Sequence, residues 1–203
     1  MRVSAGYSME KAMQAKGSLL VCGIDEVGRG CLAGPLVAAA VVLPAGCELE
    51  LYDSKMLSPI ERLQLANLVS EEAIAAGTGW VKNTEIDEHG MAWALREAYE
   101  RALEDMECEV SQIFLDGNYN YLADYEICET CIKGDQKIAC VAAASILAKV
   151  QRDRFMIELA GQYPEYGFET NVGYGTKKHR NAVEAKGLTD LHRKSFCRSI
   201  VRA

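Results

Sequence analysis

Four acidic residues of this chain, Asp25, Glu26, Asp116 and Asp135, stand where a predicted strand ends or a helix begins. Such positions converge easily in an α/β domain. Carboxylates crowded beside buried strand ends repel one another unless a cation lies between them. Oxygen ligands favour a hard divalent cation such as Mg²⁺ or Mn²⁺. The four residues therefore predict a metal site suited to phosphodiester chemistry.

A glycine-rich segment, residues 27–35, follows the first acidic pair directly. Gly28, Arg29 and Gly30 begin like a dinucleotide-binding fingerprint, but the next glycine is Gly34, and an apolar run of strand type follows in place of a helix. Glycines let backbone N–H groups approach a phosphate or a sugar, and Arg29 can add a contact. The alternative is a tight turn between two strands, which explains the glycines but not the charged residues around them.

The composition indicates a globular protein of one domain, residues 1–203, with 49% hydrophobic residues. The longest apolar runs, 36–43 and 138–148, fall short of the roughly 18 residues that a membrane span needs. The first residues also lack the pattern of a signal peptide, so we expect a cytoplasmic protein. Of the eight cysteines, four lie in or beside apolar segments and are interpreted as buried thiols in a reducing compartment, namely Cys22, Cys31, Cys47 and Cys140. One Cys-x-x-Cys pair, Cys128 and Cys131, has no second pair to complete a zinc site.

The net charge of −7 is unevenly distributed along the chain. Residues 1–170 hold 14 Lys and Arg against 27 Asp and Glu, whereas residues 171–203 hold 8 against 2. A basic C-terminal segment beside an acidic body could hold phosphates while the acids hold metal, or it could be a solvated helix face.

The elements that must position these residues follow from apolar periodicity and from turn residues. Strands are predicted over residues 19–25, 36–43, 79–82, 112–115 and 127–132. Helices are predicted over residues 59–76, 84–106, 136–159 and 176–186, and from residue 189 onward. Ser58 is expected to cap the first helix, Gly77 to stop it, and Thr84 with Asp87 to form a capping box. This order predicts an α/β fold, a mixed central sheet flanked by helices with a helical C-terminal segment at about 171–203.

Seven segments, in this order and over nearly the whole chain, closely resemble the motifs of ribonuclease HII, the type 2 ribonuclease H family. They are CGIDEVGRGCLAGPLVAAAV at 22–41, DSKMLS at 53–58, LDGN at 115–118, KGD at 133–135, AASILAKVQRD at 143–153, GYGTKKH at 173–179 and HRKSF at 192–196. The related ribonuclease HIII carries Glu as its fourth acid and an extra N-terminal domain, so Asp135 and the early first motif favour type HII.

The resemblance implies a ribonuclease H-like fold and an endonuclease that cuts the RNA strand of RNA–DNA hybrids. It also implies cutting on the 5′ side of single ribonucleotides embedded in duplex DNA, which leaves a 3′-hydroxyl and a 5′-phosphate. Asp25, Glu26, Asp116 and Asp135 are then the catalytic, metal-binding set for Mg²⁺ or Mn²⁺ in a two-metal mechanism. RNA–DNA hybrids and ribonucleotide-containing DNA duplexes are the expected partners; protein partners stay open, and a monomer is expected.

By the same resemblance, Gly28, Arg29 and Gly30 grip the ribonucleotide and sense its 2′-hydroxyl, with Tyr174 packing on the neighbouring deoxyribose. Without the family match, Tyr174 would read as a loop tyrosine that stacks on the core. Three further substrate contacts are expected to bind phosphates, namely Lys55, Ser145 and Lys149. One departure stands before Gly173, where Asn171 and Val172 replace a His-Lys pair and remove a cation near the predicted groove.

Two kinds of residue are set apart from the catalytic set. A helix continuous from residue 136 would place Asp153 about 27 Å from Asp135, so we expect it to partner a basic residue and not a metal. His192 is interpreted as a structural residue, because metal-assisted hydrolysis requires no histidine base. Two alternatives stay open: a ribonuclease H-like nuclease with little preference for single ribonucleotides, and a module that binds RNA–DNA hybrids without cutting them.

Overall fold

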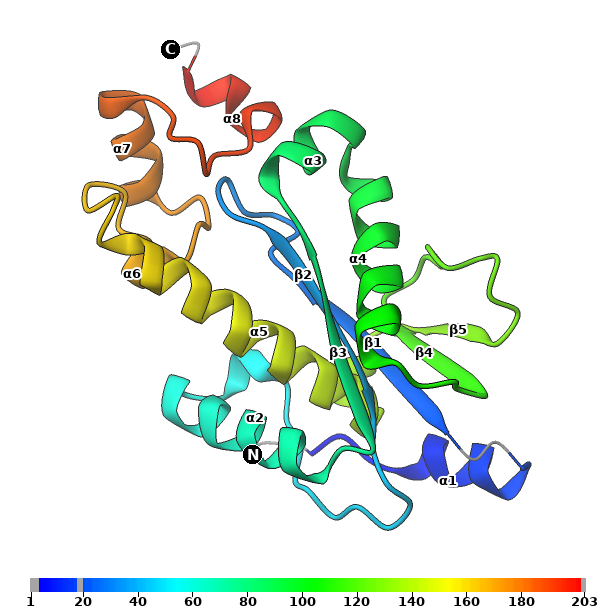
Figure 1. The fold of residues 1–203 in the computed structure, drawn as a ribbon. Helices are drawn as coiled ribbons and strands as arrows, with labels where there is room; N and C mark the ends of the chain where they lie inside the picture. The colour runs from blue at the N-terminus through cyan, green and yellow to red at the C-terminus, as the bar shows by residue number, and fades with distance from the viewer. Residues whose placement is uncertain (1–3, 18–19, 202–203) are drawn as a thin grey trace.

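A mixed five-stranded sheet forms the centre of the molecule (Figure 1). The computed structural model describes residues 4–17 and 20–201, so residue 19 of the first predicted strand and Arg202 of the basic segment lie outside it. The strands are β1 (Val21–Val27), β2 (Leu36–Val42), β3 (Ala75–Val81), β4 (Gln112–Asp116) and β5 (Cys128–Cys131), in the order β3-β2-β1-β4-β5. The pairs β1–β2 and β2–β3 are antiparallel, whereas β1–β4 and β4–β5 are parallel. The predicted mixed sheet is therefore confirmed.

Helices cover both faces of the sheet (Figure 1). One face packs against α5 (Ala139–Ala160), with α1 (Ser8–Ala15) and α2 (Pro59–Glu72) beside it, and the other packs against α4 (Met91–Met106), which follows α3 (Asn83–His89). The start of α5 is rich in alanine, and its backbone approaches β1 closely at Gly23. A Cβ on Gly23 would lie 2.2 Å from the Cys140 carbonyl carbon, so only glycine fits there. As predicted, β2 is buried on both faces.

A third apolar cluster lies at the C-terminal end of α5. It joins that end to α6 (Phe168–Asn171), α7 (Lys177–Lys186) and α8 (Lys194–Val201), the last helices in Figure 1. Two short 3₁₀ turns, η1 (Ser54–Met56) and η2 (Gly134–Gln136), carry the DSK and KGD motifs. Among the described residues, no helix is both long and apolar enough to cross a membrane.

The start of β3 differs from the prediction. We expected a helix as far as residue 76 and a strand only from residue 79, but α2 ends at Glu72 and β3 begins at Ala75. Gly77 and Gly79 are strand residues over which the α4 backbone passes: a Cβ at Gly79 would lie 1.9 Å from the Ala98 carbonyl oxygen. Close approach of a distant helix, and not a turn, explains these glycines.

Several helix boundaries also need correction. The predicted helix 84–106 is broken at Gly90, which has a φ of 84°, into α3 and α4. The N-terminus of α3 is capped at Lys82, whose backbone N–H donates to the Glu85 side chain at 2.7 Å, and not by the predicted Thr84–Asp87 pair. At the predicted helix 136–159, η2 precedes α5, so that helix begins at residue 139. The last helix begins at residue 194, not at 189. Helix α1 was not predicted, and α6 lies within residues 166–175, which were expected to be a loop.

Candidate active site

The adjacent acids Asp25 and Glu26 point toward opposite faces of the sheet, because successive side chains of a strand alternate. Asp25 is buried on the α5 side, where the Ser145 hydroxyl of α5 hydrogen-bonds to it. Glu26 turns to the α4 side, where the Tyr99 hydroxyl donates to its Oε2 at 2.5 Å. The two helices therefore each orient one of the two carboxylates.

The register of the parallel pair β1–β4 brings the third acid into place. Ile24 lies beside Leu115, so the next residues along the two strands, Asp25 and Asp116, are neighbours at the same sheet edge. The Asp116 Oδ1 accepts a hydrogen bond from the backbone N–H of Gly134 at 2.6 Å. Because Gly134 directly precedes Asp135, this bond ties the fourth acid to the third.

The electrostatics of these carboxylates show that they are crowded. Burial, followed by the charges of Glu26 and Asp116, raises the pKa of Asp25 well above its usual range. Burial also raises the pKa of Glu26, although the Tyr99 hydrogen bond acts against it. The pKa of Asp135 is raised by burial and then by Asp116 and Asp53. All the groups are oxygen donors, and their shared negative charge is what a hard divalent cation neutralises.

Two basic side chains form loose ion pairs with these acids. Arg29 lies 3.9 Å from Glu26, and Lys55 lies 3.9 Å from Asp135. In the described residues no three acidic, histidine or cysteine side chains already surround one ion position. The donor set fits a divalent cation chemically.

A cavity of about 480 Å³ opens over three of the four acids. It is lined by the acids Asp25, Glu26 and Asp116, by the loop residues Val27, Gly28, Arg29 and Gly30, and by Ser54, Lys55, Ser145, Lys149 and Tyr174. Every residue predicted to contact substrate thus lines this one cavity. Asp135 does not line it and reaches the site beside Asp116.

The glycines of the loop have different reasons to be glycine. Gly28 has a φ of 95°, and a Cβ there would lie 2.3 Å from the Arg152 Nε. A Cβ on Gly30 would meet no atom within 4 Å. Packing within the protein therefore explains Gly28 but leaves Gly30 unexplained, and Gly30 faces the cavity.

Comparison with known proteins gives the family: the ribonuclease HII family model matches residues 22–199. The chain belongs to the ribonuclease HII family. It is 45% identical over 194 residues to ribonuclease HII of Thermosynechococcus vestitus, which covers 95% of this chain and 90% of that protein. It is therefore an endonuclease of the ribonuclease H type, which hydrolyses RNA in RNA–DNA hybrids.

Solved structures confirm the ribonuclease H-like fold. Ribonuclease H2 from Pyrococcus horikoshii OT3 superposes with a TM-score of 0.77 at 27% identity and covers 90% of this chain and 97% of its own. Bst-RNase HIII, solved in complex with Mn²⁺, has a TM-score of 0.59 at 20% identity, with 92% of this chain and 71% of its own covered. The second likeness shows the fold alone.

The two late histidines of this ribonuclease HII chain form a buried structural pair. Thr189 N–H donates to His192 Nδ1 at 2.9 Å, so a neutral His192 carries its proton on Nε2 and donates to His179 Nε2 at 3.0 Å. His179 Nδ1 then donates to the carbonyl oxygen of Tyr174 at 2.9 Å. The structural interpretation of His192 is confirmed, and the pair holds the backbone of Tyr174.

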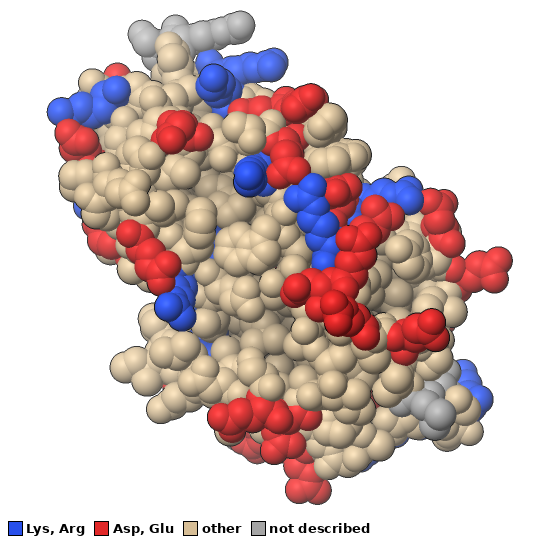
Figure 2. All heavy atoms as spheres, in the orientation of Figure 1, with Lys and Arg blue, Asp and Glu red and all other residues tan. Residues whose placement is uncertain are grey.

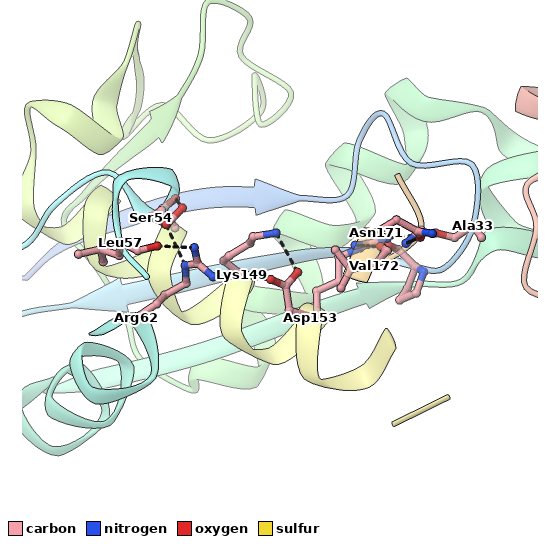
Figure 3. A network of polar contacts seen from close by, with 12 residues as sticks. Ala33, Ser54, Leu57, Arg62, Lys149, Asp153, Asn171 and Val172 are labelled. Carbon is pink, nitrogen blue, oxygen red and sulfur yellow. Dashed lines mark hydrogen bonds and ion pairs between the residues drawn. The ribbon is translucent and has the colours of Figure 1, made fainter. Parts of the chain in front are cut away.

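Asp153 is an ion-pair partner, as predicted from helix geometry. It accepts from Lys149 Nζ at 2.8 Å and lies 3.7 Å from Arg62 Nη1 (Figure 3). Arg62 of α2 also donates to the carbonyls of Ser54 and Leu57, on either side of Lys55. The network links the DSK turn to α5 and holds Lys149 at the cavity edge.

The basic side chains of the C-terminal segment do not line the cavity. Of its cations, Lys178 pairs with Glu169, Lys186 pairs with Glu165, and Arg193 is buried. The basic residues lining the cavity are Arg29, Lys55 and Lys149. Figure 2 shows a run of acidic side chains near the centre of the face turned to the viewer. Phosphate contacts inside the cavity would therefore come from Arg29, Lys55 and Lys149, and a role of the C-terminal segment outside the cavity stays a prediction.

The Asn171–Val172 departure also has a different consequence from the one expected. Asn171 is buried, and its side chain donates to the Tyr166 carbonyl and accepts from the Gly173 N–H. It shapes the turn before Gly173 and does not face the groove. Sequence reasoning missed Tyr99, which orients Glu26, because no local pattern links two residues this far apart in the chain.

Proposed function

We propose that this ribonuclease HII family member cuts on the 5′ side of single ribonucleotides embedded in duplex DNA and leaves a 3′-hydroxyl and a 5′-phosphate. Asp25, Glu26, Asp116 and Asp135 hold Mg²⁺ or Mn²⁺. The observation that carries the proposal is the shared cavity, in which the acids meet a glycine-rich loop whose Gly30 leaves room that the protein does not fill.

The metal part of the proposal rests on the crowded oxygen donors. Burial and mutual repulsion destabilise the ionised carboxylates without a cation, so cation binding is favoured. The known structure of a ribonuclease HIII with Mn²⁺ gives independent support from a protein of the same fold. Bound divalent cations would supply an activated water and stabilise charge on the phosphate. Tyr99, Ser145 and the Gly134 N–H orient the carboxylates for that purpose.

Recognition of the ribose rests on the loop. Close approach of a sugar to the backbone at Gly30 would distinguish a 2′-hydroxyl from a hydrogen, with Arg29 beside it. Tyr174, which is 37% exposed, faces the same cavity and can pack on the next deoxyribose. Lys55, Lys149 and Ser145 lie where they can contact phosphates.

The first experiment maps the ends produced from a DNA duplex that holds one ribonucleotide, with Mg²⁺ or Mn²⁺ present. Cleavage on the 5′ side with a 3′-hydroxyl and a 5′-phosphate is expected. An intact duplex with either metal, while an RNA–DNA hybrid is cut, would indicate a general hybrid nuclease. Binding of both substrates without any cleavage would indicate a binding module.

Asp116→Asn should bind the duplex yet cut at least roughly a hundredfold more slowly.

A second experiment tests Gly30 against a matched glycine. Gly30→Ala adds a methyl group in open space, so the fold should keep its stability, while cleavage of the single-ribonucleotide duplex should fall at least about tenfold. Gly161→Ala also adds a methyl group in open space, but at the end of α5, and should change neither. Normal cleavage by Gly30→Ala would remove the loop backbone from ribose recognition.

A further inference from the structure

Arg152, in the middle of α5, is fully buried and bonds only to backbone carbonyls among its described hydrogen-bond partners. Its Nε donates to Pro35 O at 2.8 Å and its Nη2 to Ala33 O at 3.0 Å, both in the glycine-rich segment. Its Nη1 donates to Val172 O at 2.8 Å, in the turn before Tyr174. One guanidinium group therefore connects two cavity-lining segments.

A second buried arginine, Arg193, holds the glycine-rich segment from the C-terminal side. Its Nε and Nη2 both donate to Gly34 O, at 3.0 and 2.9 Å, and its Nη1 donates to Arg29 O at 3.1 Å. Burial lowers its pKa to about 10. In the described part of the chain, neither Arg152 nor Arg193 makes an ion pair with a carboxylate.

The two segments also contact each other directly. The backbone N–H groups of Leu32 and Ala33 donate to Gly173 O at 2.9 and 3.3 Å, and Cys31 forms a β-bridge with Tyr174. Gly173 has a φ of 88°, and a Cβ there would lie 2.2 Å from Ala33 O. The spacing between the glycine-rich segment and Tyr174 is therefore fixed both by this backbone contact and by Arg152.

Arginine is a costly way to hold two loops together, because a buried charge without a carboxylate partner loses its hydration. Apolar packing would hold the segments at lower cost but would let them slide. The guanidinium group is planar, and its donors point in fixed directions, so it sets the relative position of the carbonyls that it bonds. One of the segments that it positions carries Gly30 and the other leads to Tyr174, and both residues line the cavity.

We propose that Arg152 is a positioning residue that sets the distance between the glycine-rich loop and Tyr174, and thereby the preference for a ribose followed by a deoxyribose. The proposal rests on the function proposed above. Arg193 supports it by fixing the other end of the loop, while the carboxylates are oriented by separate partners. Disturbing Arg152 should therefore change substrate choice and leave metal use intact.

The test compares Arg152→Lys with Arg154→Lys. Lysine keeps the charge at 152, but one ammonium group cannot reproduce the planar arrangement of three bonds. Arg154 lies on the same helix, is exposed, and pairs with Glu158. The readout is kcat/KM for the single-ribonucleotide duplex divided by kcat/KM for an RNA–DNA hybrid, together with the Mn²⁺ concentration that gives half-maximal rate.

For Arg152→Lys, this ratio should fall at least about tenfold while the Mn²⁺ requirement stays within about twofold of wild type. Arg154→Lys should match wild type in both. Gly173→Ala disturbs the same spacing without touching a charge and should lower the ratio in the same direction, so it decides the matter if Arg152→Lys does not fold. An unchanged ratio, or an equal loss on both substrates, would overturn the positioning role. A wild-type enzyme without preference for the single ribonucleotide would instead refute the proposed function, and the role of Arg152 with it.

Discussion

Tyr99→Phe is the sharpest single-atom perturbation of the proposed metal site. Tyr99 is 1% exposed, and its hydroxyl donates to Glu26 Oε2 at 2.5 Å. Phenylalanine keeps the ring in its packing and removes only the donor, so no cavity forms. Burial raises the pKa of Glu26 and the Tyr99 hydrogen bond lowers it, so the variant should hold Glu26 less firmly in its ionised form.

The size of the effect follows from the kind of bond. A hydrogen bond to a charged group contributes about 1.5–3 kcal/mol, and about 1.4 kcal/mol corresponds to a tenfold change in an equilibrium constant. Loss of a partner that orients a metal ligand weakens metal affinity or activity by roughly 10- to 100-fold. The Mn²⁺ concentration for half-maximal cleavage should therefore rise by about that factor in Tyr99→Phe. Because ionised Glu26 is the ligand, the acid limb of the pH–rate profile should also move to higher pH.

The assay is a Mn²⁺ titration of initial cleavage rates on an RNA–DNA hybrid at several pH values. Tyr166→Phe is the matched control, because Tyr166 is also a buried tyrosine, but its hydroxyl donates to Gly187 O at 3.0 Å, in the third apolar cluster. The control should lose stability alone and keep the wild-type Mn²⁺ requirement. Equal Mn²⁺ requirements in Tyr99→Phe and wild type would refute the assignment of Glu26 as a ligand oriented by Tyr99.

Three further predictions concern stability. Burial lowers the pKa of His192 from 6.5 to about 4. As the pH falls, the unfolded state therefore takes up the imidazole proton before the folded state does. The stability that neutral His192 contributes is present above pH 6.5, and about 2 kcal/mol of the free energy of unfolding should be lost by about pH 5. Urea unfolding should show a flatter pH dependence for His192→Asn, and parallel pH curves would contradict this reasoning. Glu10→Ala removes the acceptor of the Cys140 N–H at the start of α5 and should cost about 1–2 kcal/mol in urea unfolding, whereas Glu10→Gln should keep most of it; equal midpoints for Glu10→Ala and wild type would rule out this cap. Gly79→Ala should destabilise the fold by about 1–3 kcal/mol or more, because its Cβ would lie 1.9 Å from Ala98 O, while Gly161→Ala should melt like wild type; an unchanged melting temperature for Gly79→Ala would show that α4 can move away.

The strands that carry the acids could be predicted because their signals are local. Continuous apolar runs followed by acids and turn residues mark the ends of β1 and β4, and the alanine-rich run marks α5. The start of β3 could not be predicted, since Gly77 looks locally like a helix stop. The actual reason for Gly77 and Gly79 is the α4 backbone about twenty residues later, and a contact of that kind leaves no mark in the neighbouring sequence.

The convergence of the four acids could also be predicted from the sequence, but not the way in which they are held. Asp25 and Glu26 are adjacent in the chain and were treated as one pair, whereas strand alternation gives them different partners, Ser145 and Tyr99. A metal ligand must be an oxygen, nitrogen or sulfur donor, so its residue type is restricted and can be recognised. A hydroxyl or a backbone N–H that orients it can come from almost any residue on any packed element.

The same asymmetry separates the glycines of the glycine-rich segment. Gly28 is constrained from inside, because Arg152 and Pro35 O occupy the space of its Cβ, while nothing in the protein occupies the corresponding space at Gly30. When packing within the protein already requires a glycine, that glycine says little about the ligand. When a glycine beside a cavity has no such requirement, it points to a ligand that needs the space. Gly30 therefore supports ribose recognition more strongly than Gly28, although the two look equivalent in the sequence. Arg152 connects them, because the group that excludes a side chain at Gly28 also fixes the loop on which Gly30 stands.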